Sequence, residues 1–445
     1  MSPDPAQGHA YHRLSPARVL DLDPLIDDPK TRIVVCCGSG GVGKTTTAAA
    51  LGLRAAERGR KVVVLTIDPA RRLAQSMGID SLDNTPRRVK GVEGDGELHA
   101  MMLDMKRTFD EIVEAHADAE RATTILNNPF YQSLSAGFAG TQEYMAMEKL
   151  GQLRARDEWD LIVVDTPPSR SALDFLDAPK RLGSFLDGRL IRLLTAPAKL
   201  GGRAGMKFLN VGMSMMTGTL GKLLGGQLLK DVQTFVAAMD TTFGGFRTRA
   251  DATYKLLQAP GTAFLVVAAP ERDALREAAY FVERLAAEDM PLAGLVLNRV
   301  HGSGADRLSA EQALAAAENL EDSRIVDQDG GKAGLRNSPD TYGSSEPPAS
   351  GSSEPPASGT CSSGADQAVL GVDGLTVGLL RLHAERMRLL SREQRTRDRF
   401  TALHPEVAVA EVAALPGDVH DLAGLRDIGD RLAANRPELP ETADD

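Results

Sequence analysis

The chain of 445 residues has only three cysteines and no C-x-x-C pair, so thiolate-built zinc and iron–sulfur sites have no ligand set here. Cys36 and Cys37 are neighbours in an apolar run, where strand geometry predicts that they point to opposite faces. Both are interpreted as small buried side chains. Cys361 lies in a low-complexity segment. The eight histidines are scattered without ligand spacing and indicate no metal site.

Long apolar runs are also missing. No uncharged stretch approaches the roughly 20 residues that a membrane span needs, and the segment from Met1 to Leu25 lacks a signal-peptide pattern. These features predict a cytoplasmic protein. The formal net charge of −10 opposes nonspecific nucleic-acid binding, and the acidic end from Pro437 to Asp445 differs from a basic membrane anchor.

The most informative stretch is Gly38–Thr46, which reads G-S-G-G-V-G-K-T-T and matches the phosphate-binding pattern G-x-x-x-x-G-K-[ST]. A β-branched run over 31–37 precedes it and a helix-forming segment over 45–58 follows. Lys44 is expected to reach the β- and γ-phosphates of ATP, and the Thr45 hydroxyl to bind Mg²⁺. The whole predicted nucleotide contact comprises Gly38, Gly40, Gly41, Val42, Gly43, Lys44, Thr45 and Thr46.

Two further apolar strands end in carboxylates. The run 61–67 leads into Asp68-Pro-Ala-Arg71, and the run 160–164 ends at Asp165, followed by Thr-Pro-Pro-Ser. In a parallel sheet both carboxylates lie at the strand ends where ligands bind. Taken alone, Asp68 equally suits an Asp-Pro turn and Asp165 a helix N-cap. Strands alternating with helices predict an α/β fold with a mostly parallel sheet flanked by helices.

At these motifs the chain resembles the P-loop ATPases that include arsenite-pump subunits and tail-anchored-protein targeting factors. The resemblance implies that Asp68 orients or deprotonates the attacking water and that Asp165 supports Mg²⁺ through a bound water. It also implies that Asn298, at the end of the strand 292–297, contacts adenine; an ordinary turn asparagine is the alternative. Gly140 to Glu148 resembles a stretch at the family's dimer interface.

Ser39 departs from the family pattern. Related proteins carry there a lysine that reaches the nucleotide of a dimer partner, and Arg71 stands where the family has histidine. Two readings of the function follow. The first is Mg²⁺-dependent ATP hydrolysis that drives a homodimeric or heterodimeric switch, for which a hydrophobic protein is the candidate client. The second is a nucleotide-binding regulatory subunit that pairs with an active paralogue carrying the lysine.

The expected organisation has four parts. An N-terminal arm covers 1–30, and a P-loop ATPase core covers 31–326 with helical insertions at about 105–150 and 177–258. A Gly-, Ser- and Pro-rich linker covers 327–366, in which the segment 343–350 is repeated at 351–358. The part 367–445 supplies a helix over 375–400, a last strand over 407–412 and an acidic tail.

A methionine-rich stripe lies in the second insertion. Apolar residues between Met206 and Leu223 recur every three or four positions, which is typical of one face of a helix, although several glycines weaken it. The stripe suits a surface for hydrophobic partners, a dimer interface and ordinary core packing alike. The sequence leaves the cargo and the pathway open.

Overall fold

The computed structural model describes residues 18–67, 72–135, 141–167, 248–333 and 364–434. The predicted sites at Asp68 and Arg71, the stripe over 206–223, Cys361 and the acidic tail lie outside these ranges. The chain divides into two units, one of residues 1–301 with 396–438 and one of residues 302–395 with 439–445. The two units are described separately below.

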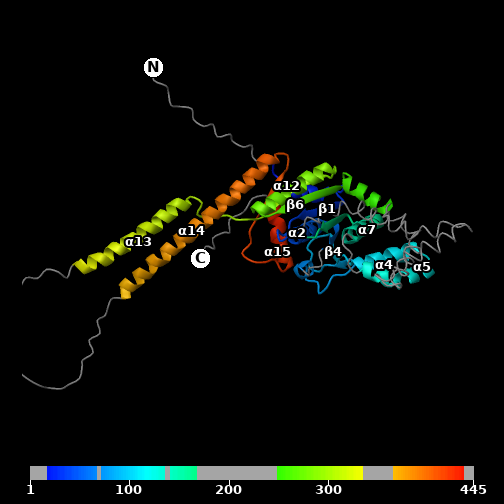
Figure 1. Ribbon diagram of the computed structural model, residues 1–445, viewed down its shortest axis with the longest axis horizontal. Helices are drawn as coiled ribbons and strands as arrows, with labels where there is room; N and C mark the ends of the chain where they lie inside the picture. Colours follow the sequence, from blue (N-terminus) through cyan, green and yellow to red (C-terminus); the bar gives the residue numbers. More distant parts are fainter. Residues whose placement is uncertain (1–17, 68–71, 136–140, 168–247, 334–363, 435–445) are drawn as a thin grey trace, which may run out of the picture. The chain divides into compact units, whose positions relative to one another are not determined.

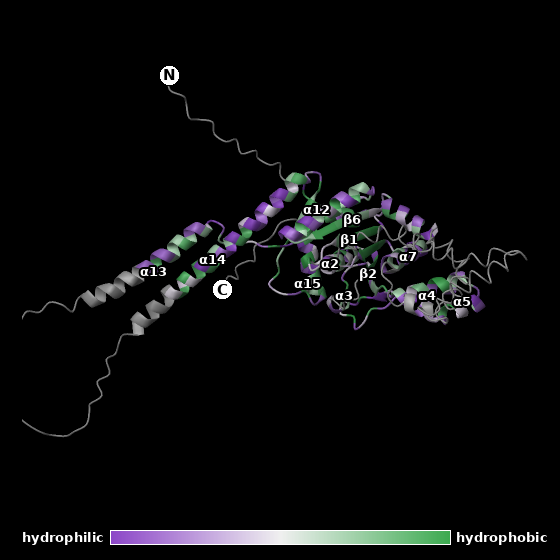
Figure 2. Cartoon of the chain, in the orientation of Figure 1, coloured by the Kyte–Doolittle hydropathy of each residue, from purple (hydrophilic) through white to green (hydrophobic). Residues whose placement is uncertain are grey.

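The first unit contains an eight-stranded sheet in the order β3-β4-β2-β5-β1-β6-β7-β8. All neighbouring strands are parallel except β3 and β4, which confirms the predicted mostly parallel α/β fold. The strands are β1 Ile33–Gly38, β2 Lys61–Thr66, β3 Arg87–Arg88, β4 Glu97–Met102, β5 Leu161–Asp165, β6 Thr262–Ala268, β7 Leu292–Val300 and β8 Val409–Ala413. The strand β6 is drawn as a strongly hydrophobic ribbon in Figure 2.

Two apolar cores cover the two faces of the sheet, because successive strand residues point in opposite directions. Ile33, Val35 and Cys37 of β1 join one core, whereas Val34 and Cys36 join the other. The two cysteines therefore lie on opposite faces, as the sequence predicts, and both are buried.

The helices of the first unit divide between these cores. Side chains of α4 Met105–His116, α7 Thr141–Arg156 and α12 Arg272–Ala287 pack in the first, and those of α2 Lys44–Glu57 and α15 Leu422–Ala434 in the second. Figure 1 labels each of these helices. Asp104 caps α4, and Asp118 caps the helix α5 Ala119–Leu126, each by accepting a backbone hydrogen bond. The remaining helices among the described residues of this unit are α1 Leu22–Asp27, α3 Arg72–Ser76 and α6 Pro129–Ser135, with a further helical stretch over 248–258.

Arg60, at the start of β2, ties the N-terminal arm to the sheet. Its buried guanidinium donates to the carbonyl oxygens of Ile26 and Thr31, each at 2.7 Å, and also to those of Asp28 and Asp160. Arginine suits this position better than lysine, because its planar guanidinium holds several N–H donors in a fixed geometry. The arm predicted over 1–30 is thus anchored to the sheet from α1 onward.

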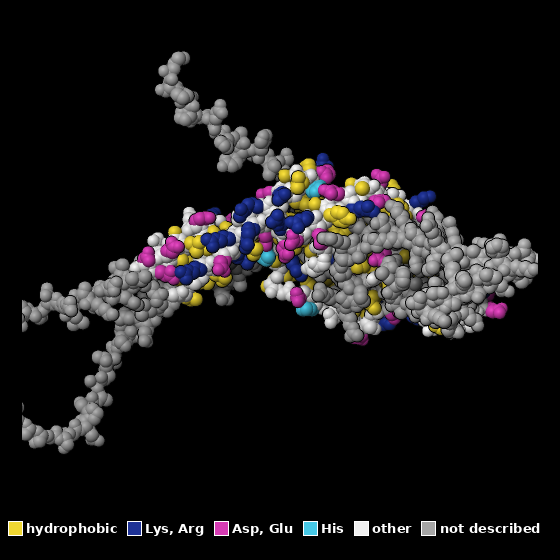
Figure 3. All heavy atoms as spheres, in the orientation of Figure 1, with side chains coloured by type: hydrophobic (Ala, Val, Ile, Leu, Met, Phe, Trp, Pro, Cys, Tyr) yellow, Lys and Arg dark blue, Asp and Glu magenta, His cyan; other side chains and the backbone are white. Residues whose placement is uncertain are grey.

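The second unit is built from α13 Ala310–Ala333 and from α14 Gly364–Leu403, whose last turns belong to the first unit. Ala313, Ala384 and their neighbours form a small core between the two helices, and Arg381 pairs with Glu321 at 2.6 Å. Basic side chains are prominent on the surface of this helix pair in Figure 3. The two helices overlap the ends of the linker predicted over 327–366, and residues 334–363 lie outside the described part. Within the described ranges, no helix is long and apolar enough to cross a bilayer.

Candidate nucleotide-binding site

The loop after β1 lies at the carboxyl ends of the parallel strands, where ligands bind in open α/β sheets. Gly38 leaves the strand with φ of +149°, and a β-carbon there would lie 2.1 Å from the carbonyl oxygen of Val267. Gly43 caps α2 with φ of +95°. Only glycine, which lacks a β-carbon, fits these two backbone conformations and the close approach to the Val267 oxygen. The predicted strand, glycine-rich loop and helix are therefore all present in the expected order.

Lys44 is the first residue of α2, and its side chain is directed back over the loop. Its ammonium donates to the backbone oxygen of Ser39 at 2.7 Å, and only 5% of the residue is exposed. Ser39 is itself 9% exposed. The lysine is thus held at the loop, where a phosphate oxygen can replace the Ser39 carbonyl as its partner.

Asp165 lies at the end of β5 and accepts two hydroxyl hydrogen bonds on the same oxygen. Thr45 donates to Oδ2 at 2.8 Å and Thr66 donates to Oδ2 at 2.9 Å. Asp165 is fully buried, and Thr66 pairs with it across the β2–β5 ladder. The structure thus brings together Lys44, Thr45 and Asp165. Thr66 is a further member that sequence analysis missed, although its place directly before the Ile67-Asp68 segment was a usable signal.

The two cysteines beside the loop are unreactive side chains. Burial, followed by the negative charge of Asp165, raises the pKa of the Cys36 thiol well above its ordinary value. Burial raises the pKa of the Cys37 thiol to about 12. Because the thiolate is the nucleophile and the metal ligand, neither residue contributes such chemistry at neutral pH.

Asn298 lies at the end of β7 and contacts the loop directly. Its Nδ2 donates to the backbone oxygen of Val42 at 2.8 Å, and the residue is 8% exposed. The predicted contact with adenine stays a prediction, but the structure places the side chain at the nucleotide loop. Sequence analysis gave no sign of the bond to Val42, because it joins residues 256 positions apart.

Two other side chains hold the segments around the loop. Gln142 of α7 donates from Nε2 to the backbone oxygen of Ile67 at 2.9 Å, directly before Asp68. Thr166, directly after Asp165, donates from Oγ1 to the backbone oxygen of Cys36 at 2.9 Å. These contacts hold the backbone directly before Asp68 and directly after Asp165. They were missed because glutamine and threonine carry no motif of their own.

The oxygen donors suit Mg²⁺ when a nucleotide is present. Mg²⁺ prefers one or two protein oxygens together with phosphate oxygens and water. The Thr45 hydroxyl, with Asp165 behind it, offers this arrangement. In the described part of the chain, no group of three or more His, Cys, Asp or Glu side chains could hold a metal ion unaided. The residues therefore fit a metal that arrives with the nucleotide.

Comparison with known proteins agrees with this geometry. The family model described as "Anion-transporting ATPase" matches residues 31–321, which is more than half of the chain. The chain belongs to the anion-transporting ATPase family. Membership makes it an ATPase, and it confirms the resemblance and the P-loop fold inferred from the motifs.

Similar fungal proteins are each named "ATPase GET3". The one from Malassezia globosa is 30% identical over 37% of this chain and 47% of its own length. The one from Podospora anserina is 25% identical over 63% of this chain and 76% of its own length. The one from Ajellomyces dermatitidis is 27% identical over 66% of this chain and 80% of its own length.

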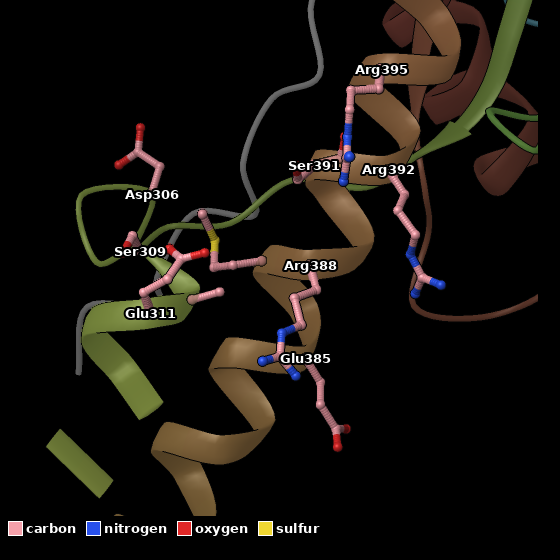
Figure 4. A pocket seen from close by; sticks show the side chains of 10 residues that line it. Asp306, Ser309, Glu311, Glu385, Arg388, Ser391, Arg392 and Arg395 are labelled. Atoms are coloured by element: carbon pink, nitrogen blue, oxygen red, sulfur yellow. The ribbon is translucent and has the colours of Figure 1, made fainter. Parts of the chain in front are cut away.

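A separate cavity of about 800 Å³ lies in the second unit of this ATPase, between the start of α13 and the middle of α14. Figure 4 shows Asp306, Ser309 and Glu311 on one side and the α14 side chains on the other. Its charged lining is mixed, with the acidic residues Asp306, Glu311 and Glu385 and the basic residues Arg388, Arg392 and Arg395. The mixture does not favour a polyphosphate, so the loop after β1 remains the candidate nucleotide site.

Proposed function

We propose that this chain hydrolyses ATP to ADP and phosphate with Mg²⁺ and that hydrolysis drives a dimeric conformational switch. The main support is the contact of Thr45 with Asp165, because it joins the first turn after the phosphate loop to the end of β5, together with the bond that holds the Lys44 ammonium at the loop. Phosphoryl transfer depends mainly on positioning and on charge stabilisation, which such groups supply.

The proposed roles follow from position. The loop amides and Lys44 bind the phosphates, Thr45 and Asp165 hold the metal site, and Asp68 positions the water. Bound Mg²⁺ supplies charge neutralisation at the β- and γ-phosphates. Loss of the γ-phosphate releases contacts at the two segments after β2 and β5, which Gln142 and Thr166 hold at their bases. In this proposal Asn298 also contacts adenine.

The decisive experiment separates binding from hydrolysis in the purified full chain. Lys44→Ala is expected to lose most of its ATP affinity, because the loop then lacks its positively charged side chain. Asp68→Asn is expected to bind ATP with near-native affinity and to release phosphate at least tenfold more slowly. Titration calorimetry measures binding, and phosphate release measures turnover. Native turnover by Asp68→Asn would remove that residue from the mechanism.

A dimer is proposed from the resemblance of Gly140–Glu148 to the family's interface, and a hydrophobic client from the stripe over 206–223. Ultracentrifugation with and without ATP tests the first. Crosslinking from cysteines introduced in the stripe tests the second. Cytoplasmic location and the lack of nucleic-acid binding remain predictions from composition.

The second candidate function is a regulatory subunit that binds ATP and activates a paralogue. Ser39 favours it, because a serine cannot supply the positive charge that the family's lysine brings to the partner's nucleotide. Turnover by the purified chain alone decides between the two candidates. An inactive chain that binds ATP and accelerates a lysine-bearing paralogue would support the regulatory function.

A further inference from the structure

The end of β7 departs from regular strand geometry directly after Asn298. Arg299 has φ of +61°, a left-handed conformation that is disfavoured for residues with a β-carbon. The pairing of β7 with β8 shifts register between Leu297 and Val300, which marks an irregularity of the β-bulge kind. The Arg299 side chain is exposed. Such a conformation persists where the surrounding structure requires it, and bulges re-aim neighbouring side chains.

The neighbouring side chain is Asn298, and it fits closely against the phosphate loop. Its amide nitrogen donates to the Val42 oxygen at 2.8 Å in a buried contact. A β-carbon on Gly43 would lie 2.2 Å from the same nitrogen. Glycine at position 43 is therefore needed for the approach of Asn298 as well as for its own φ. The loop and the end of β7 form one fitted contact.

We propose that Asn298 is a positioning residue that sets the orientation of the Val42–Gly43 peptide in the phosphate loop. In a planar trans peptide the C=O and the following N–H point in opposite directions. A hydrogen bond from Asn298 to the Val42 oxygen therefore turns the Gly43 N–H away from Asn298, and this N–H becomes available to a phosphate. The loop amides are then oriented before the nucleotide arrives.

This role differs from recognition of the base. One hydrogen of the Asn298 amide is used by Val42, while its oxygen and second hydrogen remain for a base. A contact with adenine alone affects only nucleotides that carry adenine. Positioning of the loop affects every ligand with a triphosphate, whatever its base. The expected effect on ligand affinity rests on the proposed nucleotide binding. The expected effect of Asn298 on the loop without nucleotide does not.

The test uses two variants of the full chain that break the contact in different ways. Asn298→Leu keeps a similar volume but removes the donor, and Arg299→Val opposes the left-handed conformation and leaves Asn298 unchanged. Arg299→Gly is the matched control, because glycine accepts that conformation. Asn84→Leu is a second control, since Asn84 is another buried asparagine, whose amide donates to Glu111 and accepts from Asp104 and Thr108 instead.

The first readout is amide hydrogen exchange of residues 38–44 without nucleotide, compared with exchange of β2. In the Asn298→Leu and Arg299→Val variants, we expect the loop amides to exchange faster than in the native chain. The β2 amides should exchange at the native rate. Both controls are expected to keep native loop exchange. Calorimetry then measures binding of MgATP, of the Mg²⁺ complex of purine riboside triphosphate, which lacks the amino group of adenine, and of magnesium tripolyphosphate.

A loss of about tenfold is expected for all three ligands, the effect of one lost hydrogen bond to a buried carbonyl. Native loop exchange, or a loss confined to MgATP, would overturn the proposal and leave Asn298 as a base contact only. If the native chain binds none of the three ligands, the proposed function fails. In that case hydrogen exchange of the empty loop still decides the positioning role.

Discussion

The hydroxyl of Thr45 donates to Oδ2 of Asp165 at 2.8 Å, which joins the first turn of α2 to the end of β5. Thr66 donates to the same oxygen from the end of β2. Three elements therefore meet at one carboxylate oxygen. The orientation of Asp165 therefore depends on Thr66 as well as on Thr45.

Thr66→Val tests that dependence, because valine has nearly the shape of threonine and lacks the hydroxyl. We expect the Mg²⁺ concentration for half-maximal phosphate release to rise about tenfold, since a hydrogen bond to a charged group contributes about 1.5–3 kcal/mol. The affinity for ATP in the absence of Mg²⁺ should change little.

Thr262→Val is the matched control for this experiment. Thr262 is a buried threonine at the start of β6, and its hydroxyl donates to the Leu256 oxygen instead. Both variants are compared for thermal stability before the Mg²⁺ titration. An equal shift in the two variants, or none in Thr66→Val, would show that Thr66 has no part in the metal site.

Acid stability depends on the ion pairs between α1 and α2. Arg54 donates two hydrogen bonds to Asp23 at 2.6 and 2.8 Å, and Arg58 pairs with Asp27. These hydrogen bonds are the main cause that lowers the pKa of each carboxyl below 3.8. The unfolded chain then binds more protons near pH 4, so the pairs stabilise the fold above that pH. The contribution is lost as the pH falls through the lowered pKa.

Asp23→Asn should therefore reduce the free energy of unfolding by about 1 kcal/mol at pH 7 and by much less at pH 3. Urea denaturation at both pH values measures the difference. Asp418→Asn is the control, because Asp418 is exposed and lies outside this network. A deficit that is equal at both pH values would contradict the assignment to an ion pair.

The sequence predicted the parts of the fold that local pattern determines. The strand before the glycine-rich loop, the helix after it and the opposite faces of Cys36 and Cys37 are confirmed, because strand alternation and the G-x-x-x-x-G-K-[ST] spacing are properties of neighbouring residues. The β4 strand Glu97–Met102 was missed. Its local sequence does not favour a strand, and the strand forms because it pairs with β2.

Contacts between distant residues were beyond prediction. The bonds from Asn298 to Val42 and from Gln142 to Ile67 depend on how β7 and α7 meet the loop ends, which no local pattern encodes. The helix α13 was also missed, because its alanine- and glutamate-rich sequence lacks a wide apolar stripe. Its buried contacts with α14 are made by alanines, against which partly buried leucine and methionine side chains pack.

Removal of residues 334–363 tests the predicted linker. These bounds are used because α13 ends at Ala333 and α14 begins at Gly364. We expect a chain in which Ala333 is joined to Gly364 by a short Gly/Ser connector to fold and hydrolyse ATP like the native chain. The physical reason is that loop-closure entropy depends weakly on length and that the removed segment is poor in apolar residues. A Gly/Ser segment of native length is the control. A drop in melting temperature with the short connector alone would indicate strain, and a drop with both would indicate that the segment packs.

The last prediction concerns Ser39, whose backbone oxygen accepts a hydrogen bond from the Lys44 ammonium. In the family, a lysine at this position stabilises charge on the phosphate of the partner's nucleotide, a role that resembles an arginine finger and raises rates by orders of magnitude. This chain lacks that charge, so we expect slow turnover by the isolated protein and strong activation by a paralogue that carries the lysine.

A substitute charge within a homodimer is the competing explanation, and Arg71 and Arg72 are the candidates because they follow the Asp68 segment. The two explanations differ in measurable ways. If a paralogue is required, the rate per chain stays low at every protein concentration, and Ser39→Lys raises it once dimers form. If an arginine substitutes, the rate per chain increases with concentration, Ser39→Lys adds little, and Arg71→Ala or Arg72→Ala removes most activity. A fast isolated enzyme with that arginine dependence would refute the paralogue requirement, because the missing lysine would then have been replaced within the same chain.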